Sequence, residues 1–336
     1  MGKSIGIDLG TANTLVYVKG RGIVLREPSV VAVEARTRRV VAVGNEAKLM
    51  LGKTPGSITA MRPLKDGVIA EFDITAAMLH HFFDKVSGSS IFSRPRVIIC
   101  IPYGVTEVEK RAVEDVTLEA GAQSVALIEE PVAAAIGSGL KVEGAQGSMI
   151  VDIGGGTTEV AVLSLGGIVL SSSLRSAGDE LDEAIIAYMK RKHNILIGEM
   201  TAEMLKKNIG SVYPQADRGS MVIRGRNLLN GLPATISVSS AEIREAMSEE
   251  ISHIVECIRT TLENTPPELS SDIYDNGIML AGGGALLAGL DTLISRMTGG
   301  IRTTVAKSPL DCVAVGIGHV IESVGELGGI VTFRTR

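Results

Sequence analysis

The fold is indicated most strongly by residues 149–160, which read MIVDIGGGTTEV. Near the N-terminus, residues 5–16 read IGIDLGTANTLV and repeat this pattern, with Asp8 aligned to Asp152 and glycines and threonines also matching. Each copy predicts a buried strand that ends in an aspartate, a tight glycine turn and a second strand, which together form a β-hairpin. Two copies about 144 residues apart indicate two similar halves, each contributing one hairpin.

Helical and strand patterns alternate along the rest of the chain. Apolar periodicity and helix-end signals predict helices over 75–86, 106–120, 132–136 and 239–264, the last opened by the capping box Ser239-Ser240-Ala241-Glu242. Residues 96–102 and 276–280 are predicted to be buried strands, and 145–147 and 214–219 to be linkers. Strands that alternate with helices predict an α/β fold.

Length and composition exclude several classes of protein. The chain has 336 residues, enough for two domains or one large bilobed domain, and its 45% apolar content predicts a substantial core. A net charge of −5 argues against a nucleic-acid partner. Three widely separated cysteines without a C-x-x-C pair favour neither zinc nor a disulfide framework, and fit a reducing compartment. We expect neither a signal peptide nor a membrane-spanning helix.

Three glycine clusters organise the candidate site, at residues 10–13, 154–158 and 282–285. Glycine-rich turns let backbone N–H groups converge on an anion. The third cluster follows a strand and precedes a helix, so it could present a helix N-terminus to a phosphate or to the adenosine end of a nucleotide. Any single cluster is best explained as a simple turn, whereas two matching hairpins together with a third cluster favour nucleotide binding.

The two strand-end carboxylates, Asp8 and Asp152, are candidate magnesium ligands. Mg²⁺ prefers oxygen ligands and keeps several waters, so two aspartates could hold it through water. The alternative is that each aspartate caps its own turn.

These motifs resemble those of the actin, Hsp70 and hexokinase ATPase superfamily. Asp8–Thr11 is similar to its first phosphate loop, Asp152–Thr158 to its second and Gly282–Ala285 to its adenosine loop, while residues 129–135, EEPVAAA, resemble its connecting helix. Within the superfamily the chain resembles the bacterial actins of the MreB family over nearly its whole length. The stretches that carry this closer likeness are RPLKDGVIA (62–70), LIEEP (127–131), VDIGGGTTEVAV (151–162) and TPPEL (265–269).

The resemblance implies an actin-like ATPase fold, in which two similar lobes with RNase H-like cores flank a nucleotide cleft. It also implies four subdomains. These are IA (1–31, 73–143 and 306–336), IB (32–72), IIA (144–180 and 247–305) and IIB (181–246).

By the same resemblance, ATP with Mg²⁺ is the expected ligand, and three groups of residues are expected to contact the nucleotide. The phosphate contacts are Gly10, Thr11, Ala12 and Asn13 on one side, and Gly154, Gly155, Gly156 and Thr157 on the other. The adenosine contacts are Gly282, Gly283, Gly284, Ala285 and Leu286. The ribose and base contacts are Glu203, Met204, Leu205 and Lys206.

Two features of this assignment leave alternatives open. Glu203 and Lys206 would also form an ordinary i,i+3 surface ion pair. Asn208 stands where relatives carry glutamate, so its contribution near the ribose is in doubt.

The resemblance assigns catalysis to Glu130, which would orient or deprotonate the attacking water, with Thr157 helping to place that water. Glu129 is the rival for this role. The alternative is that Glu130 only caps the helix that starts at Pro131.

The function implied is that of a filament-forming ATPase that organises cell-wall synthesis and maintains rod shape. Its expected partners are further copies of itself in paired protofilaments, the inner face of the cytoplasmic membrane and cell-elongation membrane proteins, and it is expected to be cytoplasmic and peripheral on that membrane. Ile91 and Phe92 lie in a polar loop with Arg94 and Arg96 nearby, so they are candidates for shallow insertion among anionic headgroups. The alternative is that this loop packs on its own domain.

Two other functions remain open within the superfamily. A chaperone ATPase of the Hsp70 kind would need a substrate-binding module after the last helix, where this sequence ends at Arg336. A sugar or acetate kinase would need a base for a substrate hydroxyl and a second small-molecule pocket, and we identify neither in the sequence.

Overall fold

A computed structural model describes residues 4–87, 94–323 and 333–335. The chain divides into two compact units. Unit 1 comprises residues 1–145, 163–168 and 310–336, and unit 2 comprises residues 146–162 and 169–309. The first boundary therefore falls inside the predicted linker at 145–147. The finer division into four subdomains stays a prediction.

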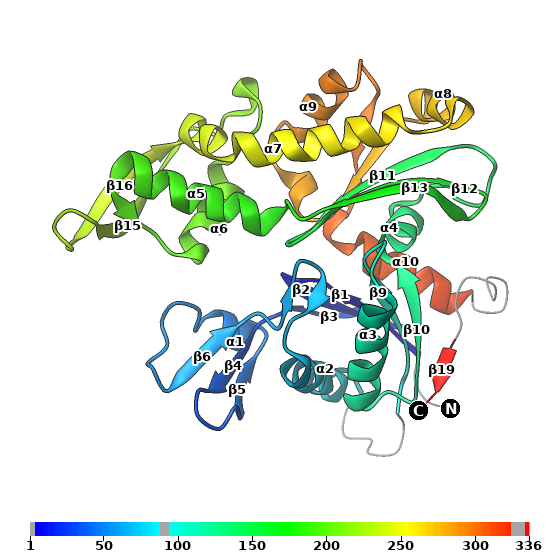
Figure 1. Ribbon diagram of the computed structural model, residues 1–336, viewed down its shortest axis with the longest axis horizontal. Coiled ribbons are helices and arrows are strands. Elements are labelled where there is room, and N and C mark those ends of the chain that lie inside the picture. The colour runs from blue at the N-terminus through cyan, green and yellow to red at the C-terminus, as the bar shows by residue number, and fades with distance from the viewer. Residues whose placement is uncertain (1–3, 88–93, 324–332, 336) are drawn as a thin grey trace. The chain divides into compact units, whose positions relative to one another are not determined.

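The main sheet of unit 1 has six strands in the order β19-β10-β9-β1-β2-β3 (Figure 1). β1 pairs antiparallel with β2 and parallel with β9, and β9 pairs parallel with β10. Its strands are β1 (Ser4–Leu9), β2 (Asn13–Val18), β3 (Gly22–Pro28), β9 (Arg96–Ile101), β10 (Ser124–Glu129) and β19 (Phe333–Thr335).

The main sheet of unit 2 repeats this arrangement, with the order β13-β12-β11-β17-β18. β17 pairs parallel with both β11 and β18. Its strands are β11 (Ser148–Ile153), β12 (Thr158–Ser164), β13 (Gly167–Leu174), β17 (Ile278–Ala281) and β18 (Thr303–Val305). The predicted repeat is confirmed, because β3-β2-β1-β9-β10 and β13-β12-β11-β17-β18 follow one order.

Helices and smaller sheets complete unit 1. Its helices are α1 (Asn45–Lys48), α2 (Phe72–Ser87), α3 (Glu107–Glu119), α4 (Glu130–Ser138), the 3-10 turn η3 (Pro309–Asp311), which straddles the boundary, and α10 (Cys312–Glu322). Its small sheets contain β4 (Val31–Glu34), β5 (Val40–Val43), β6 (Ile58–Met61), β7 (Leu64–Lys65) and β8 (Val68–Ile69). The core is aliphatic apart from Phe82 and Phe83 of α2.

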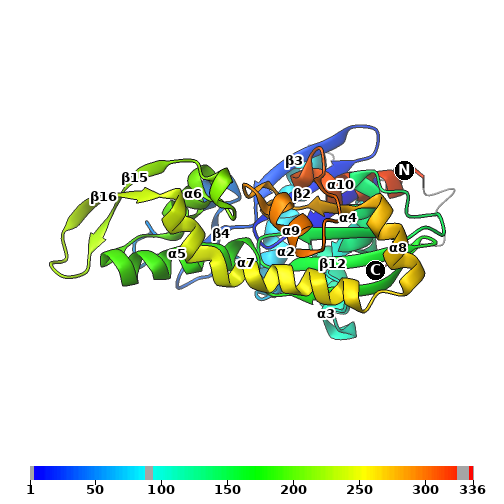
Figure 2. The same cartoon turned by 90° about the horizontal axis from the view of Figure 1, so that it is seen from above.

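Unit 2 has its own core, which includes the fully buried Leu205 and the 2% exposed Tyr188. Its helices are α5 (Gly178–His193), α6 (Glu199–Ile209), α7 (Ser240–Glu263), α8 (Pro267–Asn276), α9 (Leu290–Met297) and the 3-10 turns η1 (Pro214–Ala216) and η2 (Gly284–Leu286). A third sheet contains β14 (Ile195–Leu196), β15 (Ser220–Asn227) and β16 (Pro233–Ser239). Figure 2 shows α7 running along this unit toward α8. None of the described helices is both long and apolar enough to span a bilayer.

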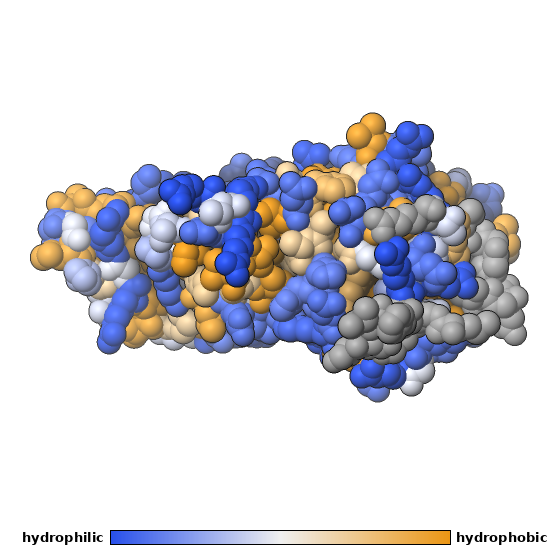
Figure 3. All heavy atoms as spheres, turned by 90° about the horizontal axis from the view of Figure 1, so that it is seen from below, coloured by the Kyte–Doolittle hydropathy of each residue, from blue (hydrophilic) through white to orange (hydrophobic). Residues whose placement is uncertain are grey.

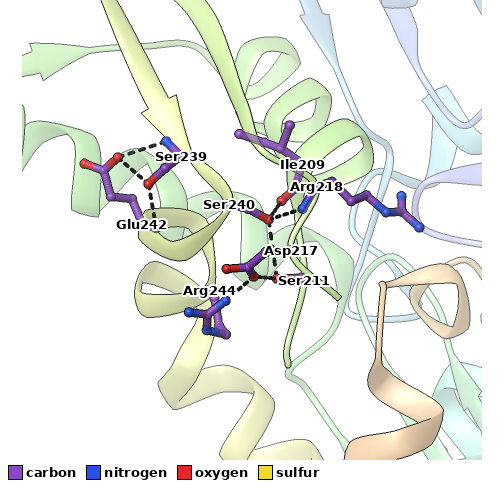
Figure 4. A network of polar contacts seen from close by, with 8 residues as sticks. All are labelled: Ile209, Ser211, Asp217, Arg218, Ser239, Ser240, Glu242 and Arg244. Atoms are coloured by element: carbon purple, nitrogen blue, oxygen red, sulfur yellow. Dashed lines mark hydrogen bonds and ion pairs between the residues drawn. The ribbon is translucent and has the colours of Figure 1, made fainter. Parts of the chain in front are cut away.

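The structure corrects one predicted element. The strand expected at 276–280 begins only at Ile278, because Asn276 ends α8 and Gly277 follows with a φ of 89°. The expected linker 214–219 is a mostly exposed connection of unit 2 that contains the 3-10 turn η1 and is held by polar contacts (Figure 4). Asp217 accepts hydrogen bonds from Ser211 Oγ at 2.5 Å and from Arg244, and Arg218 N–H donates to Ser240 Oγ at 3.0 Å.

Helices α4 and α10 of unit 1 cross at very short range. A Cβ added to Gly137 in α4 would lie 1.8 Å from the carbonyl oxygen of Cys312. One added to Gly316 in α10 would lie 1.8 Å from the carbonyl oxygen of Ala133. Only glycine permits this approach, and it fixes the helix whose first residue is Glu130.

Replacing Gly316 with alanine tests this crossing. In an open helix the change stabilises by about 1 kcal/mol, because alanine is the better helix former. Here we expect a loss of about 1–3 kcal/mol, since the new methyl group overlaps the α4 backbone. Gly167→Ala is the control, because its Cβ meets nothing within 4 Å. Chemical unfolding of both variants measures the effect, and a stabilised Gly316→Ala protein would contradict the packing described.

Candidate functional site

The first glycine turn joins β1 to β2 and is closed by one hydrogen bond between residues three positions apart. The N–H of Gly10 donates to the carbonyl oxygen of Asn13 at 3.1 Å. A Cβ on Gly10 would lie 2.8 Å from that same oxygen, so the turn needs glycine there. Thr11 is 7% exposed, and its hydroxyl accepts a hydrogen bond from the N–H of Gly67 at 3.0 Å.

The second glycine turn, between β11 and β12, has the same geometry. The N–H of Gly154 donates to the carbonyl oxygen of Thr157 at 2.9 Å. Gly155, Gly156 and Thr157 follow in the turn, and Thr157 is 8% exposed. The two predicted phosphate loops are therefore the same local structure built twice, once in each unit.

A buried threonine anchors each turn, and the sequence analysis did not identify its partners. Thr14 Oγ1 lies 2.9 Å from Ser29 Oγ, and Ser29 Oγ donates to the Gly10 carbonyl at 2.6 Å. In the second copy, Thr158 Oγ1 donates to the carbonyl oxygen of Ser176 at 2.7 Å. Ser29 directly follows β3, and Ser176 lies two residues after the end of β13. Because β3 and β13 are equivalent strands, aligning the two halves through them could have identified both serines.

Asp8 is held in an environment that disfavours its charge. It is 9% exposed, and burial raises its pKa to about 7; Cys100 Sγ, 3.5 Å from Asp8 Oδ1, lowers the pKa as a hydrogen-bond donor, and nearby Asp311 raises it. A divalent cation beside this carboxylate would offset the cost of burying it. The roles of magnesium ligand and turn cap both stay predictions for Asp8.

Asp152 occupies the matching place in unit 2 and is 3% exposed. It pairs in register with Ala281, the last residue of β17. A Cβ on Gly282 would lie 2.4 Å from Asp152 Oδ1 and 2.3 Å from the Ile153 carbonyl oxygen, so this glycine lets the third cluster close onto the second.

The third cluster differs from its prediction in one respect. Gly284–Leu286 form a three-residue 3-10 turn, and the next α-helix begins only at Leu290. Ala285 is buried, whereas Leu286 is 53% exposed. The loop therefore offers backbone and one apolar side chain, and no long helix N-terminus.

Glu130 lies at the same edge of the unit 1 sheet as Asp8. In the parallel strands, Ile7 pairs with Ile99 and Ile128 with Cys100, so the carboxyl ends of β1, β9 and β10 coincide. Burial raises the pKa of the Cys100 thiol well above its usual value, and the charges of Asp8 and Glu130 raise it further. Two candidate catalytic-site carboxylates thus lie near one buried thiol.

The alternative role of Glu130, as the cap of the following helix, fits the structure only in part. The helix begins at Glu130 itself, and the N-cap residue is Glu129, whose side chain makes no capping hydrogen bond. A negative charge at either residue is favoured by the helix dipole.

The predicted ribose-side residues on α6 divide into different environments. Lys206 Nζ lies 2.8 Å from Asp182 Oδ2, and Lys207 Nζ lies 2.5 Å from Glu203 Oε1. Each residue of the expected surface pair therefore has another partner of opposite charge. Met204 is 38% exposed, whereas the Leu205 side chain lies in the core.

Three other residues singled out in the sequence have separate outcomes. Asn208 donates from Nδ2 to the Met204 carbonyl oxygen at 2.9 Å, so its amide is bound to its own helix. Ile91 and Phe92, the predicted membrane residues, lie outside the described residues.

Comparisons with known proteins agree on one family. The model of the MreB/Mbl protein family matches residues 2–328. The chain is 54% identical over 330 residues to the cell shape-determining protein MreB of Escherichia coli strain K12, covering 97% of this chain and 95% of the relative.

Solved structures agree with the sequence comparisons. The crystal structure of MreB5 of Spiroplasma citri bound to AMPPNP has a TM-score of 0.92 and 40% identity, covering 97% of this chain and 98% of that one. Its ADP-bound structure has a TM-score of 0.91 at 40% identity, with coverages of 96% and 97%. The predicted actin-like ATPase fold is confirmed.

Neutralising Asp8 tests whether its burial is costly. Between about pH 4 and pH 7 the native state keeps a proton that the unfolded state has lost, so wild-type stability falls as pH rises through this window. Without nucleotide or metal, we expect Asp8→Asn to be more stable than wild type by about 1–4 kcal/mol at pH 8, and to match it near pH 4. Urea unfolding across this pH range measures the difference.

The control for this prediction is Asp84→Asn, which changes a carboxylate that is 72% exposed. It should show no such pH-dependent gain. Parallel stability curves for wild type and Asp8→Asn would contradict the environment described for Asp8.

Proposed function

The chain belongs to the MreB/Mbl family, and from this premise we propose that it is an ATPase that forms filaments and maintains cell shape. The observation that carries the proposal is the duplicated glycine turn, in which the Gly10–Asn13 and Gly154–Thr157 hydrogen bonds match. Each turn follows a buried strand-end aspartate, the arrangement required to bring N–H groups and a metal-binding carboxylate to phosphates. A relative with 40% identity is bound to AMPPNP in one structure and ADP in another.

ATP is proposed to bind through backbone and carboxylate groups of both units. Residues 11–13 and 155–157 supply N–H groups to the phosphates, and Gly282–Leu286 with α6 contact the adenosine. Asp8 and Asp152 would hold Mg²⁺, which would supply positive charge to offset that of the phosphates. The support for this assignment is the burial of both aspartates and the high pKa of Asp8.

Glu130 is proposed to orient the attacking water, with Thr157 as a second hydrogen-bonding group. The support is that Glu130 begins a helix fixed by the α4–α10 crossing, at the edge where the parallel strands of unit 1 end. A carboxylate held on a rigid element can act as a base or as an orienting acceptor. The water it activates attacks the terminal phosphate, which leaves ADP and inorganic phosphate.

Polymerisation and shape maintenance are proposed from family membership, because the E. coli relative is named a cell shape-determining protein. One surface of unit 2 supports contact with another protein copy. At the tip of the β15–β16 hairpin, Leu229 and Leu232 are 80% and 61% exposed, and Figure 3 shows hydrophobic residues gathered at that end of unit 2. Exposed apolar clusters mark interaction surfaces. Paired protofilaments that organise cell-wall synthesis with cell-elongation membrane proteins remain part of the proposal.

A location on the inner face of the cytoplasmic membrane is also proposed. Its support is the sequence of the loop that carries Ile91 and Phe92, with Arg94 and Arg96 beside them. Two inserted side chains bind weakly, but a filament that displays many copies binds strongly.

The test of the whole proposal is electron microscopy of the purified protein on an anionic lipid monolayer with and without Mg-ATP. We expect filaments only with Mg-ATP. Sedimentation and phosphate release on the same samples separate polymerisation from hydrolysis. A protein that neither binds ATP nor sediments with it would contradict the proposal.

Glu130→Ala tests the catalytic assignment against its rival Glu129→Ala. Loss of the base should slow single-turnover hydrolysis by about 10²–10⁴-fold while ATP binding is kept. Glu129→Ala should change the rate little. The assignment is wrong if Glu130→Ala hydrolyses at the wild-type rate, and the roles are exchanged if only Glu129→Ala is slow.

The membrane assignment is tested by a double Ile91→Ser, Phe92→Ser variant in pelleting with anionic liposomes. We expect most of the pelleted fraction to be lost, because the inserted apolar groups are removed. The matched control is Val108→Ser with Leu165→Ser, which removes two apolar side chains that are 77% and 74% exposed on unit 1. Unchanged pelleting of the loop variant would exclude this loop as the anchor.

A further inference from the structure

The second glycine turn is supported by the first turn of α5. The N–H of Gly178 donates to the Gly154 carbonyl at 3.2 Å, and the N–H of Asp179 donates to the Gly155 carbonyl at 2.8 Å. N–H groups in the first turn of a helix have no partner within it, so the glycine turn satisfies them. A Cβ on Gly178 would lie 3.1 Å from the Gly154 oxygen, so a larger residue there would displace the turn by a few tenths of an ångström. The position of the second glycine turn therefore depends on the position of α5.

A single ammonium group connects α6 to this support. Lys206 Nζ donates to the carbonyl oxygen of Gly178 and lies 2.8 Å from Asp182 Oδ2. Asp182 stands one helical turn after Gly178 on α5. Lys206 therefore joins the helix of the predicted ribose contacts to the residue whose N–H supports the glycine turn.

Burying the Lys206–Asp182 ion pair costs desolvation free energy. The side chains of Lys206 and Asp182 are 14% and 11% exposed. Asp182 Oδ1 is buried without a hydrogen-bond partner, so the carboxylate is not fully satisfied. Apolar side chains of similar volume at such places are often as stable as the ion pair or more so. The pair is thus better explained by what it positions than by the stability it adds.

We propose that Asp182 is a positioning residue that holds the Lys206 ammonium against Gly178, and so couples the ribose-side helix α6 to the second phosphate loop. This inference rests on the proposed function, because it assumes that both elements contact ATP. Asp182 itself takes no part in the chemistry. Its effect is to make occupation of the adenosine side and the geometry of the phosphate loop depend on each other.

The pair also responds to pH. Burial raises the pKa of Asp182 to about 6, Lys206 lowers it, and Glu203 on α6 and Asp179 on α5 raise it. The carboxylate is therefore charged above about pH 6 and holds Lys206 there. As pH falls through this value the carboxyl gains a proton and the coupling is lost.

The variants that test the coupling are Asp182→Asn and Lys206→Met, singly and together. Asp182→Asn keeps the shape and removes the charge. We expect each single variant to lower kcat/KM for ATP by about 10–100-fold, since small displacements of bound phosphate are costly to rate. The double variant should be no worse than the single ones, because the two residues act as a unit. The fall in wild-type kcat/KM below about pH 6 should be weaker in Asp182→Asn.

An apolar replacement separates positioning from stability. Asp182→Leu with Lys206→Met should unfold at the wild-type urea concentration or above it, yet hydrolyse ATP as poorly as Asp182→Asn. The matched control is Lys190→Met, the same substitution at an exposed lysine in the last turn of α5. It should leave kcat/KM unchanged.

The outcomes distinguish this inference from the proposed function. Wild-type protein that does not bind or hydrolyse ATP overturns both. Wild-type activity in the apolar double variant overturns the coupling alone, as does an effect of Lys190→Met equal to that of Lys206→Met. The coupling is supported if the apolar double variant loses activity but keeps its stability, and if kcat/KM of Asp182→Asn falls less than that of wild type below about pH 6.

Discussion

One hydrogen bond, made twice, determines where the candidate site can be. In each unit a glycine N–H reaches the carbonyl three residues ahead, from Gly10 to Asn13 and from Gly154 to Thr157. This closure turns the chain back immediately after a buried strand and leaves an aspartate at the strand end, enclosed by the sheet. The N–H groups of the turn and the carboxylate are the groups proposed above to meet the phosphates and the metal ion.

The buried carboxylates show two ways of managing an unfavourable charge. Burial raises the pKa of Asp8 to about 7, the Cys100 thiol lowers it and Asp311 raises it, so the charged carboxylate is disfavoured in the free protein. Asp182 has Lys206 at 2.8 Å, so its charge is offset within the protein, although one of its oxygens has no hydrogen-bond partner. The first arrangement favours ligand binding, because binding relieves a cost present in the free protein. The second arrangement favours positioning, because the Asp182 carboxylate is already paired with Lys206 of the neighbouring helix α6.

Local chemistry was predictable from the sequence, and tertiary partners were not. The capping box of Ser239 and Glu242, the repeated Asp-x-Gly turns and the α/β alternation depend on residues close in the chain, and all are present. Asp182 gives no such signal, because its importance depends on Lys206, 24 residues away and on another helix. Asn276 was assigned to a strand because it precedes an apolar run, whereas α8 continues through it until Gly277 allows the left-handed turn. Residues 214–219 have linker composition, yet the Asp217–Arg244 ion pair binds them to α7.

The two glycine turns have the same local structure, but different elements of the protein bind them. The first turn is bound by Ser29, which precedes β4, and through Thr11 by Gly67 in the β7–β8 turn, so it is tied to the small sheets of unit 1. The second is bound by the first turn of α5 and, through Lys206, by α6, which leads to the β15–β16 part of unit 2. The smaller elements of both units carry exposed surface, including the apolar hairpin tip of unit 2. Each turn is therefore connected by named contacts to a different part of the surface of its own unit.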